Sequence, residues 1–217
     1  MIGMKDSTQK PSAGRPRGFD AEKALDGAMR VFWQKGFDGA SLTDLTDAMG
    51  INRPSMYAAF GNKEELYSKT MERYVEARTQ HLGEHLGAPT SRESVELVLR
   101  DAVARFTDPN NPNGGCFGMQ GAMTCANLSP ELKEHIEDMH VALEKALRQR
   151  FSRAIDDGEL PRGSATDLAR FYAVIYQGLA FQAKAGSGRK ELYRVVDIAL
   201  EKWPRPSSKG SKASSAR

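Results

Sequence analysis

The chain has 217 residues, of which 40% are hydrophobic and 27% charged, and this ordinary globular composition excludes a chain that is disordered throughout. Its two cysteines, Cys116 and Cys125, are too few for a secreted disulfide framework and lack the paired spacing of a structural zinc site. No apolar run reaches the roughly 18 residues that cross a bilayer, and residues 1–18 lack a signal-peptide core, so we expect a cytoplasmic protein without a membrane partner.

The formal net charge of +3 is distributed unevenly along the chain. Residues 1–18 and the segment after residue 203 are basic, whereas residues 19–65 contain five basic and eight acidic side chains. Because nucleic-acid-binding modules are commonly basic, charge alone argues against DNA binding by residues 19–65. We expect residues 1–18 to form a flexible basic arm and residues 204–217 a disordered basic tail.

Hydrophobic side chains recur with helical periodicity almost throughout, and no segment shows the period of two that a strand requires, so the sequence predicts an all-α protein. The first helix is expected to begin near Asp20, a good N-cap residue, and to end at Gly36. Gly27 in its interior is expected to cost about 1 kcal/mol relative to alanine. Its predicted inward face carries Leu25, Ala28, Met29 and Phe32.

Two short helices are predicted next. Ser41 and Asp44 have the spacing of a capping box at the start of the first helix, which ends at Gly50. Asn52 can cap the second helix, and Pro54 fits its first turn because no backbone N–H is needed there. The inward faces of the two helices are expected to carry Leu42, Leu45, Met49, Met56 and Phe60.

A longer helix over residues 63–86 is predicted to connect this small domain to the rest of the chain. Further helices are expected over 91–106, 117–127, 130–155, 165–185 and 190–202, with a turn-rich loop over 108–115. The predicted fold is therefore all-α, with an N-terminal three-helix helix-turn-helix domain over 19–65. A long helix links it to a C-terminal helical ligand-binding and dimerisation domain over 66–203.

Two helices of about eight residues joined by a turn at Gly50 match the helix-turn-helix, whose second helix enters the major groove of DNA. A short helical hairpin used only for packing would show the same pattern. We therefore expect double-stranded DNA as a partner and keep the packing hairpin as the alternative.

The run GFDGASLTDLTDAMGINRPSMYAAFGNKEELY resembles the DNA-binding domain of the TetR/AcrR family of bacterial regulators. The likeness covers residues 20–67 and includes the aromatic residue after Gly36, the Gly50 turn, the Tyr57 to Phe60 pair and the start of the fourth helix at Lys63. It implies a homodimer with a DNA operator and a small-molecule effector as partners. It also implies base or phosphate contacts from Arg53, Ser55, Tyr57 and Ala58, a phosphate contact from Lys63, and backbone contacts near Ser41 and Thr43.

Most of these positions suit DNA binding on chemical grounds. Arg53 can read guanine with two hydrogen bonds, and Ser55 can bind a base or a phosphate. The Tyr57 hydroxyl suits a phosphate, with packing of the ring inside the domain as the alternative. Ala58 is smaller than the residues common at its position in the family and can contact only a thymine methyl, which limits how many bases this helix reads.

Two features are expected to bind DNA in place of basic side chains on residues 19–65. Free N–H groups at the helix starts near Ser41 and Asn52 can hold phosphates without basic side chains. Asn52 and Pro54, in the first turn of the second short helix, are therefore also predicted to bind DNA. The sequence GRPR at 14–17 resembles an AT-hook core, whose Arg15 and Arg17 would enter an A·T-rich minor groove. A solubilising tail is the alternative for this arm.

A dimer is expected because two recognition helices about 34 Å apart can read a palindrome and one alone cannot. The last two helices, which carry apolar stripes, are predicted to form its interface. Two such helices from each subunit would make a four-helix bundle. The same stripes can instead be core within one subunit. The predicted interface residues are Leu168, Phe171, Ile175, Leu179, Leu192, Val195, Val196 and Ala199.

An apolar effector pocket is predicted in the C-terminal domain, although apolar residues at helical spacing also suit an ordinary core. Its expected lining is Phe106, Phe117, Met119, Met123, Phe151, Tyr172 and Tyr176, with Cys116, Gln120 and His140 as further contacts.

Cys116 follows two glycines and precedes a predicted helix, where free N–H groups would favour a thiolate. This setting suits a sensor of oxidants or electrophiles, with a buried inert thiol as the alternative. Along one helix Cys116 and Cys125 would lie about 14 Å apart, which is beyond disulfide reach.

Two other functions remain open on the sequence alone. His81 and His85 flank Glu84 at a spacing that suits metal ligands, but HLGEH is not the HExxH motif of metalloproteases. We expect no cofactor, no metal and no catalytic residues. A helical module that binds DNA without ligand control is the second alternative to the expected function, which is a ligand- or redox-responsive transcriptional regulator that represses.

Overall fold

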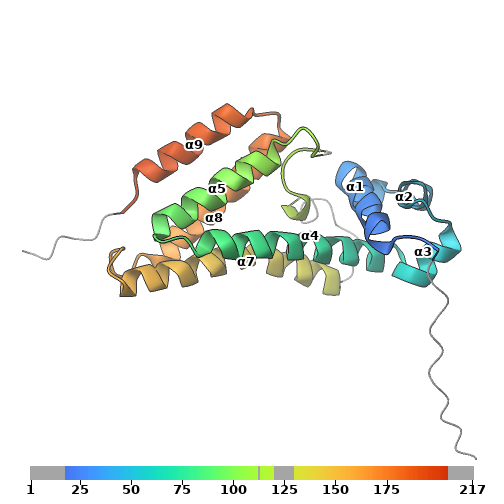
Figure 1. Cartoon of the computed structure of the whole chain (residues 1–217), viewed down its shortest axis with the longest axis horizontal. Coiled ribbons are helices and arrows are strands. Elements are labelled where there is room, and N and C mark those ends of the chain that lie inside the picture. The colour runs from blue at the N-terminus through green and yellow to red at the C-terminus, as the bar shows by residue number, and fades with distance from the viewer. Residues whose placement is uncertain (1–17, 112, 120–129, 205–217) are drawn as a thin grey trace, which may run out of the picture.

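The computed structural model describes residues 18–111, 113–119 and 130–204, and every regular element within them is a helix, which confirms the predicted fold class. Helices α1 (Ala21–Gly39), α2 (Leu42–Met49) and α3 (Arg53–Phe60) gather at one end of the molecule (Figure 1). None of the described helices is both long and apolar enough to cross a membrane.

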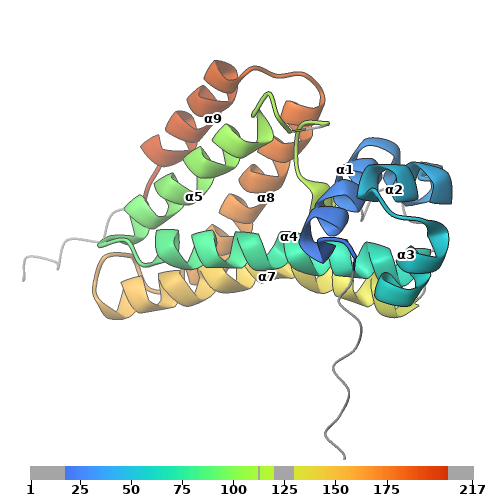
Figure 2. The ribbon, with the colours of Figure 1, turned by 45° about the vertical axis from the view of Figure 1, so that its right-hand side comes forward.

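The remaining helices extend away from this end. Helix α4 (Lys63–Leu86) leaves the N-terminal group and runs beside α7 (Pro130–Asp156) (Figure 2). Helices α5 (Ser91–Phe106), α8 (Ala165–Lys184) and α9 (Arg189–Glu201) complete the second part, in which α8 packs between α7 and α5. The long α4 is therefore the connection between the two parts, as predicted.

Most helix boundaries follow the predictions. Asp20 caps α1 by accepting the N–H groups of Glu22 and Lys23 at 3.1 and 3.3 Å. The backbone of α1 breaks at Gly36, with φ 73° and ψ 175°, although one further turn reaches Gly39. Of the helix expected over 117–127, residues 117–119 are helical and the rest lie outside the described residues, as do the predicted arm up to residue 17 and the tail from residue 205.

The structure corrects the interpretation of Gly27 as a weak point of α1. A Cβ built on Gly27 would lie 2.8 Å from the carbonyl carbon of Ala48 in α2 and still closer to its oxygen. Any larger residue would push α2 away from α1. Gly27 is therefore what allows the two helices to pack backbone against backbone.

Each of the two parts has its own hydrophobic core. The N-terminal core contains Phe32, Leu45, Met56, Leu66 and Tyr67, and the C-terminal core contains Leu99, Phe106, Leu147, Phe151 and Tyr172. The prediction that Phe117 lines the effector pocket is wrong, because its ring is buried in the N-terminal core although it comes late in the chain. Cys116 packs against both cores. The segment that contains these two residues therefore joins the two parts.

Candidate DNA-binding face and effector cavity

Local hydrogen bonds shape the helix-turn-helix. Ser41 Oγ accepts the Asp44 N–H at 3.0 Å while Asp44 Oδ2 accepts the Ser41 N–H at 3.1 Å, which confirms the capping box. Gly50 ends α2 in the left-handed conformation, and Asn52 Oδ1 then accepts the Ser55 N–H at 2.9 Å to start α3. These caps set the direction in which α3 leaves the turn.

Helix α3 presents a polar face to solvent. Met56 and Phe60 are buried in the N-terminal core, whereas the Tyr57 side chain is 47% exposed, so Tyr57 does not pack inside the domain. Arg53 Nη2 donates to Thr43 Oγ1 at 2.9 Å and links this face to α2. The other predicted DNA-binding residues on the two helices, Ser41, Asn52, Pro54, Ser55 and Ala58, are exposed or half-buried on the surface.

Lys35 and Lys63 of this domain already contact neighbouring side chains. Lys35 Nζ lies 2.6 Å from Asp44 Oδ1, and hydrogen bonds from Lys35 and then Ser41 lower the pKa of Asp44 to about 2. The Lys63 ammonium lies 4.7 Å from the centre of the Phe37 ring, and burial lowers its pKa. The remaining predicted basic contacts, Arg15 and Arg17, lie outside the described residues.

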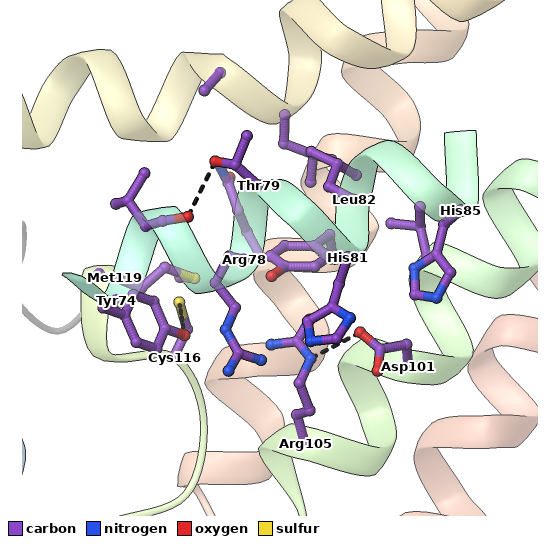
Figure 3. A pocket seen from close by; sticks show the side chains of 17 residues that line it. Tyr74, Arg78, Thr79, His81, Leu82, His85, Asp101, Arg105, Cys116 and Met119 are labelled. Atoms are coloured by element: carbon purple, nitrogen blue, oxygen red, sulfur yellow. Dashed lines mark hydrogen bonds and ion pairs between the residues drawn. The ribbon is translucent and has the colours of Figure 1, made fainter. Parts of the chain in front are cut away.

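A cavity of about 140 Å³ lies between α4, α5, α7, α8 and the segment 116–119 (Figure 3). Of the predicted effector residues it brings together Cys116, Met119 and Tyr176. Phe106 lies behind Tyr176, with their ring centres 5.3 Å apart. Gln120, Met123 and the side chain of His140 lie outside what the structure describes.

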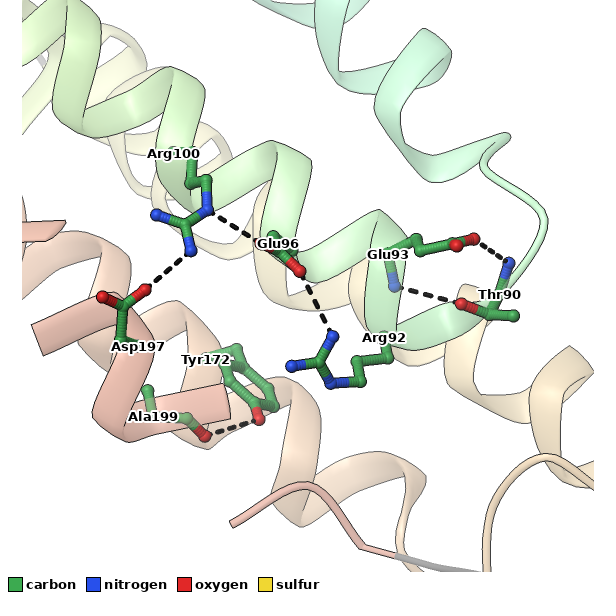
Figure 4. Close-up of polar contacts among 8 residues, drawn as sticks. All are labelled: Thr90, Arg92, Glu93, Glu96, Arg100, Tyr172, Asp197 and Ala199. Atoms are coloured by element: carbon green, nitrogen blue, oxygen red, sulfur yellow. Dashed lines mark hydrogen bonds and ion pairs between the residues drawn. The ribbon is translucent and has the colours of Figure 1, made fainter. Parts of the chain in front are cut away.

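The structure places Phe151 and Tyr172 elsewhere, which corrects their prediction as cavity lining. Both rings pack against Trp203, and the Tyr172 hydroxyl donates to the Ala199 carbonyl at 3.1 Å (Figure 4). Burial raises the pKa of Tyr172 to about 12. The two aromatic residues stabilise the packing of α9 on the C-terminal core. Their prediction as cavity lining was wrong because helical spacing alone does not tell a cavity-facing position from a core-facing one.

Most of the titratable residues that line the cavity were not predicted from the sequence. Arg78, His81 and His85 follow one another along one face of α4, and Asp101 pairs with Arg105 on α5 through a 2.7 Å hydrogen bond. Their spacings of three and four residues were visible in the sequence as helix-face neighbours. Within the described part of the chain, no three His, Cys, Asp or Glu side chains are placed to hold a metal ion.

Cys116 sits where the cavity meets the N-terminal core. Its sulfur lies 3.3 Å from the Tyr74 hydroxyl, and the pKa of Tyr74 is raised by its burial. Gly115 before it has φ 67°, and a Cβ there would lie 2.6 Å from the Ala180 carbonyl oxygen in α8. Only glycine therefore lets this segment approach α8 closely enough to place Cys116 beside Tyr74.

The same segment also holds the N-terminal part. Asn113 Nδ2 donates to the Trp33 carbonyl of α1 at 2.9 Å. The Phe117 ring packs against Trp33 and Tyr74, with ring centres 5.5 and 5.6 Å apart. Cys116 is therefore connected to α1 through Tyr74, which contacts both the Cys116 sulfur and the Trp33 ring.

Helices α8 and α9 divide the predicted interface residues between two environments. Leu179, Leu192, Val196 and Ala199 are buried in the C-terminal core and Leu168 and Ile175 are partly buried, which corrects the prediction that all eight face a partner. Phe171 and Val195 remain exposed. With them lie exposed apolar residues that the sequence analysis did not single out, namely Val174, Phe181 and Ile198.

Residues 24–70 match a family model described as bacterial regulatory proteins, tetR family. The chain is similar to the HTH-type transcriptional repressor ComR of Escherichia coli K12, with 35% identity over 207 residues that cover 92% of this chain and 97% of ComR. It is also similar to the HTH-type transcriptional repressor BdcR of that strain, with 30% identity over 91% of this chain and 96% of BdcR.

A solved structure shows the same likeness. It contains a cysteine mutant of the TetR family transcriptional regulator CifR complexed with 26-bp double-strand operator DNA. The TM-score is 0.81 and the identity 40%, with coverage of 88% of this chain and 100% of that chain.

Proposed function

The chain belongs to the TetR family of bacterial regulatory proteins, and from this membership we propose that it is a repressor that a small molecule releases from its operator. It is a DNA-binding transcriptional regulator and not an enzyme. The observation that carries the proposal is the exposed face of α3, on which Arg53 and Tyr57 stand beside Thr43 of α2. The similar CifR complex with operator DNA supports a role for this face in binding DNA.

In this proposal α3 enters the major groove. The Arg53 guanidinium exchanges its hydrogen bond with Thr43 for a guanine edge, and the exposed Tyr57 hydroxyl binds a phosphate. Ser55 and Ala58 add short-range contacts, while the N–H groups at the starts of α2 and α3 hold phosphates near Ser41 and Asn52. Affinity then depends on helix ends and geometry more than on surface charge.

We propose that the operator is palindromic and that two copies of the chain bind it. Phe171, Val174 and Phe181 of α8 and Val195 and Ile198 of α9 leave an apolar surface uncovered in the single chain. Exposed apolar surface of this kind marks an interface. Pairing α8 and α9 with the same helices of a second copy would cover it and hold the two α3 helices at a fixed spacing.

Release from DNA is proposed to begin at the cavity. A molecule bound there meets Tyr74 of α4 and Cys116. Tyr74 packs against Trp33 and Phe117, and Cys116 packs against the N-terminal core. A shift of these residues would change the angle between α4 and α1. The ligand would thereby favour a dimer whose recognition helices do not fit successive major grooves.

Cys116 offers a second, covalent route to the same state. Its sulfur would add to the electrophilic carbon of an activated alkene, and the thiol proton would end on the neighbouring carbon. The adduct must occupy space beside Tyr74, because Cys116 is packed against both cores. This route needs no partner cysteine.

The proposal is tested by selecting duplexes that bind the full chain from a random library and measuring affinity by fluorescence anisotropy. We expect a palindromic sequence bound by two copies of the chain, with far weaker binding to a scrambled duplex of equal length. Similar affinity for both duplexes would instead identify a DNA-binding module without sequence preference and would refute the repressor proposal.

A further inference from the structure

Among the described residues, Arg78 is a cation inside the cavity without a carboxylate partner. It extends from α4 into the space bounded by Tyr74, Cys116 and Arg105 (Figure 3). Its guanidinium carbon lies 5.4 Å from the centre of the Tyr74 ring, yet its Nε is buried without a hydrogen-bond partner. Among the described residues no carboxylate forms an ion pair with Arg78. The Arg78 side chain as a whole is half-buried, but its buried Nε donor has no acceptor, and an unsatisfied buried donor costs free energy that proteins rarely retain without a use.

The other charged groups that face the cavity do not relieve this cost. Asp101 is the one carboxylate among the described lining residues, and it is already paired with Arg105 at 2.7 Å. Burial raises the pKa of Tyr176, and the positive charges of Arg105 and Arg78 oppose that rise. His81 and His85 add no negative charge. The described wall therefore has an excess of positive charge at one point.

Most of the rest of the described wall is apolar, with Thr79 and Gln177 as further polar residues, and the space is small. Val75, Leu82, Val98, Met119 and Leu143 line it together with the Tyr74 and Tyr176 rings. Its volume of about 140 Å³ is close to that of a protein cavity known to admit benzene. A ligand that fits has one apolar body about the size of a six-membered ring and one group that accepts hydrogen bonds from a guanidinium.

We propose that the effector of this cavity is a small apolar monocarboxylate, whose carboxylate binds Arg78 and whose apolar body fills the space between α4, α5, α7 and α8. This inference names the ligand class for the effector site of the proposed function and therefore rests on that function. Guanidinium and carboxylate groups match in shape and charge, and the paired hydrogen bonds orient the ligand. Because Arg78 stacks on Tyr74, a ligand that draws Arg78 toward it also acts on the Tyr74 to Cys116 contact.

The experiment uses the full chain without DNA and measures the Kd of benzoate by isothermal titration calorimetry. Benzamide serves as the neutral ligand of the same shape, and acetate as the carboxylate without an apolar body. We expect the affinity for benzoate to be at least about 10-fold higher than that for benzamide or acetate, because the ion pair with Arg78 forms in a small apolar site. Equal affinity for benzoate and benzamide would overturn the proposal, as would the absence of benzoate binding.

Two variants of Arg78 and one control complete the test. Arg78→Met should reduce benzoate affinity to that of benzamide, whereas Arg78→Lys should keep a preference for benzoate because the charge remains. Arg148→Met removes an exposed arginine of α7 outside the cavity lining and should leave both ligands unaffected. Unchanged benzoate binding by Arg78→Met would refute the assignment of Arg78. Circular dichroism shows whether Arg78→Met is folded; if it is not, Arg78→Lys and the comparison of benzoate with benzamide test the assignment.

Failure of this inference can be told apart from failure of the proposed function. Operator affinity without any ligand, measured by fluorescence anisotropy, tests the repressor alone. A chain that binds its operator but not benzoate has the proposed function and a different effector. A chain that binds benzoate but no palindrome has the ligand site without the repressor function.

Discussion

The hydroxyl of Tyr74 lies 3.3 Å from the sulfur of Cys116, so the helix that leaves the DNA-binding domain touches the thiol at the edge of the cavity. Tyr74 also packs edge-on against Trp33 of α1, with ring centres 5.6 Å apart. One aromatic side chain therefore contacts both Cys116, the proposed sensor, and the first helix of the DNA-binding domain.

Replacing Cys116 by serine should separate DNA binding from covalent release. We expect Cys116→Ser to bind the operator as the unchanged chain does but to stay bound after treatment with N-ethylmaleimide, because no thiol remains beside Tyr74. Fluorescence anisotropy before and after treatment measures this. Cys125→Ser is the matched control and should still be released. Release of Cys116→Ser by the reagent would show that Cys116 is not the sensor.

Arg53→Ala and Tyr57→Ala should each weaken operator binding. A lost base or phosphate contact costs about 1–3 kcal/mol, which is roughly 5- to 150-fold in affinity. Both side chains are exposed, so the fold should persist, and the unfolding temperature should change little. Arg162→Ala, an exposed arginine of the C-terminal part, is the control. Specific binding that survives both substitutions would remove α3 from DNA recognition.

Gly27→Ala should destabilise the protein although alanine favours helices. The added methyl group would collide with the Ala48 carbonyl, and such overpacking costs about 1–3 kcal/mol, more than the roughly 0.5–1 kcal/mol gained in helix propensity. Thermal unfolding measures the change, and operator affinity should fall because α2 moves. Gly83→Ala in α4, where a Cβ meets nothing within 4 Å, should be neutral or stabilising. A higher unfolding temperature for Gly27→Ala would contradict the close-packing argument.

Val174→Asp should prevent dimer formation. Val174 is 58% exposed in the single chain, so the aspartate is tolerated there, but burying its charge in an interface is costly. Sedimentation analysis should show a monomer that binds the operator weakly. Leu97→Asp, at an exposed apolar position of α5, is the control and should remain dimeric. A dimeric Val174→Asp protein would place the interface on another surface.

The capping box at α2 should make stability depend on pH. The folded protein lowers the pKa of Asp44 to about 2, below the value near 4 expected when the chain is unfolded. The carboxylate therefore contributes stability above about pH 4, and this contribution is lost as the pH falls toward 2. The difference in unfolding temperature between the unchanged chain and Asp44→Asn should be largest at pH 7 and shrink below pH 4.

Asp157→Asn is the control for loss of an exposed carboxylate near a helix end. A difference between the unchanged chain and Asp44→Asn that stays constant from pH 7 to pH 3 would mean that the charge of Asp44 does not support the cap. The comparison is best made at low salt, where exposed charges are least screened.

Local chemistry made the helix-turn-helix predictable from sequence. The caps at Asp20, Ser41 and Asn52 and the end of α2 at Gly50 depend on residues within a few positions of one another, so their pattern is visible in the linear chain. The exposed position of Tyr57 was not decided in this way, because a single aromatic residue suits either side of a short helix.

The amino-acid sequence by itself determined the helical class, nearly all helix boundaries and the family, because these depend on periodicity, capping and turn residues close together in the chain. Only the tertiary structure decided which face of each long helix is buried. It buried Leu179, Leu192, Val196 and Ala199 in the core and left Val174 exposed. It also placed Arg78, which has no carboxylate partner among the described residues, in the cavity. The contact between Tyr74 and Cys116 spans 42 positions of the sequence, so it exists only when distant helices pack together, and this same contact links the cavity to the DNA-binding domain.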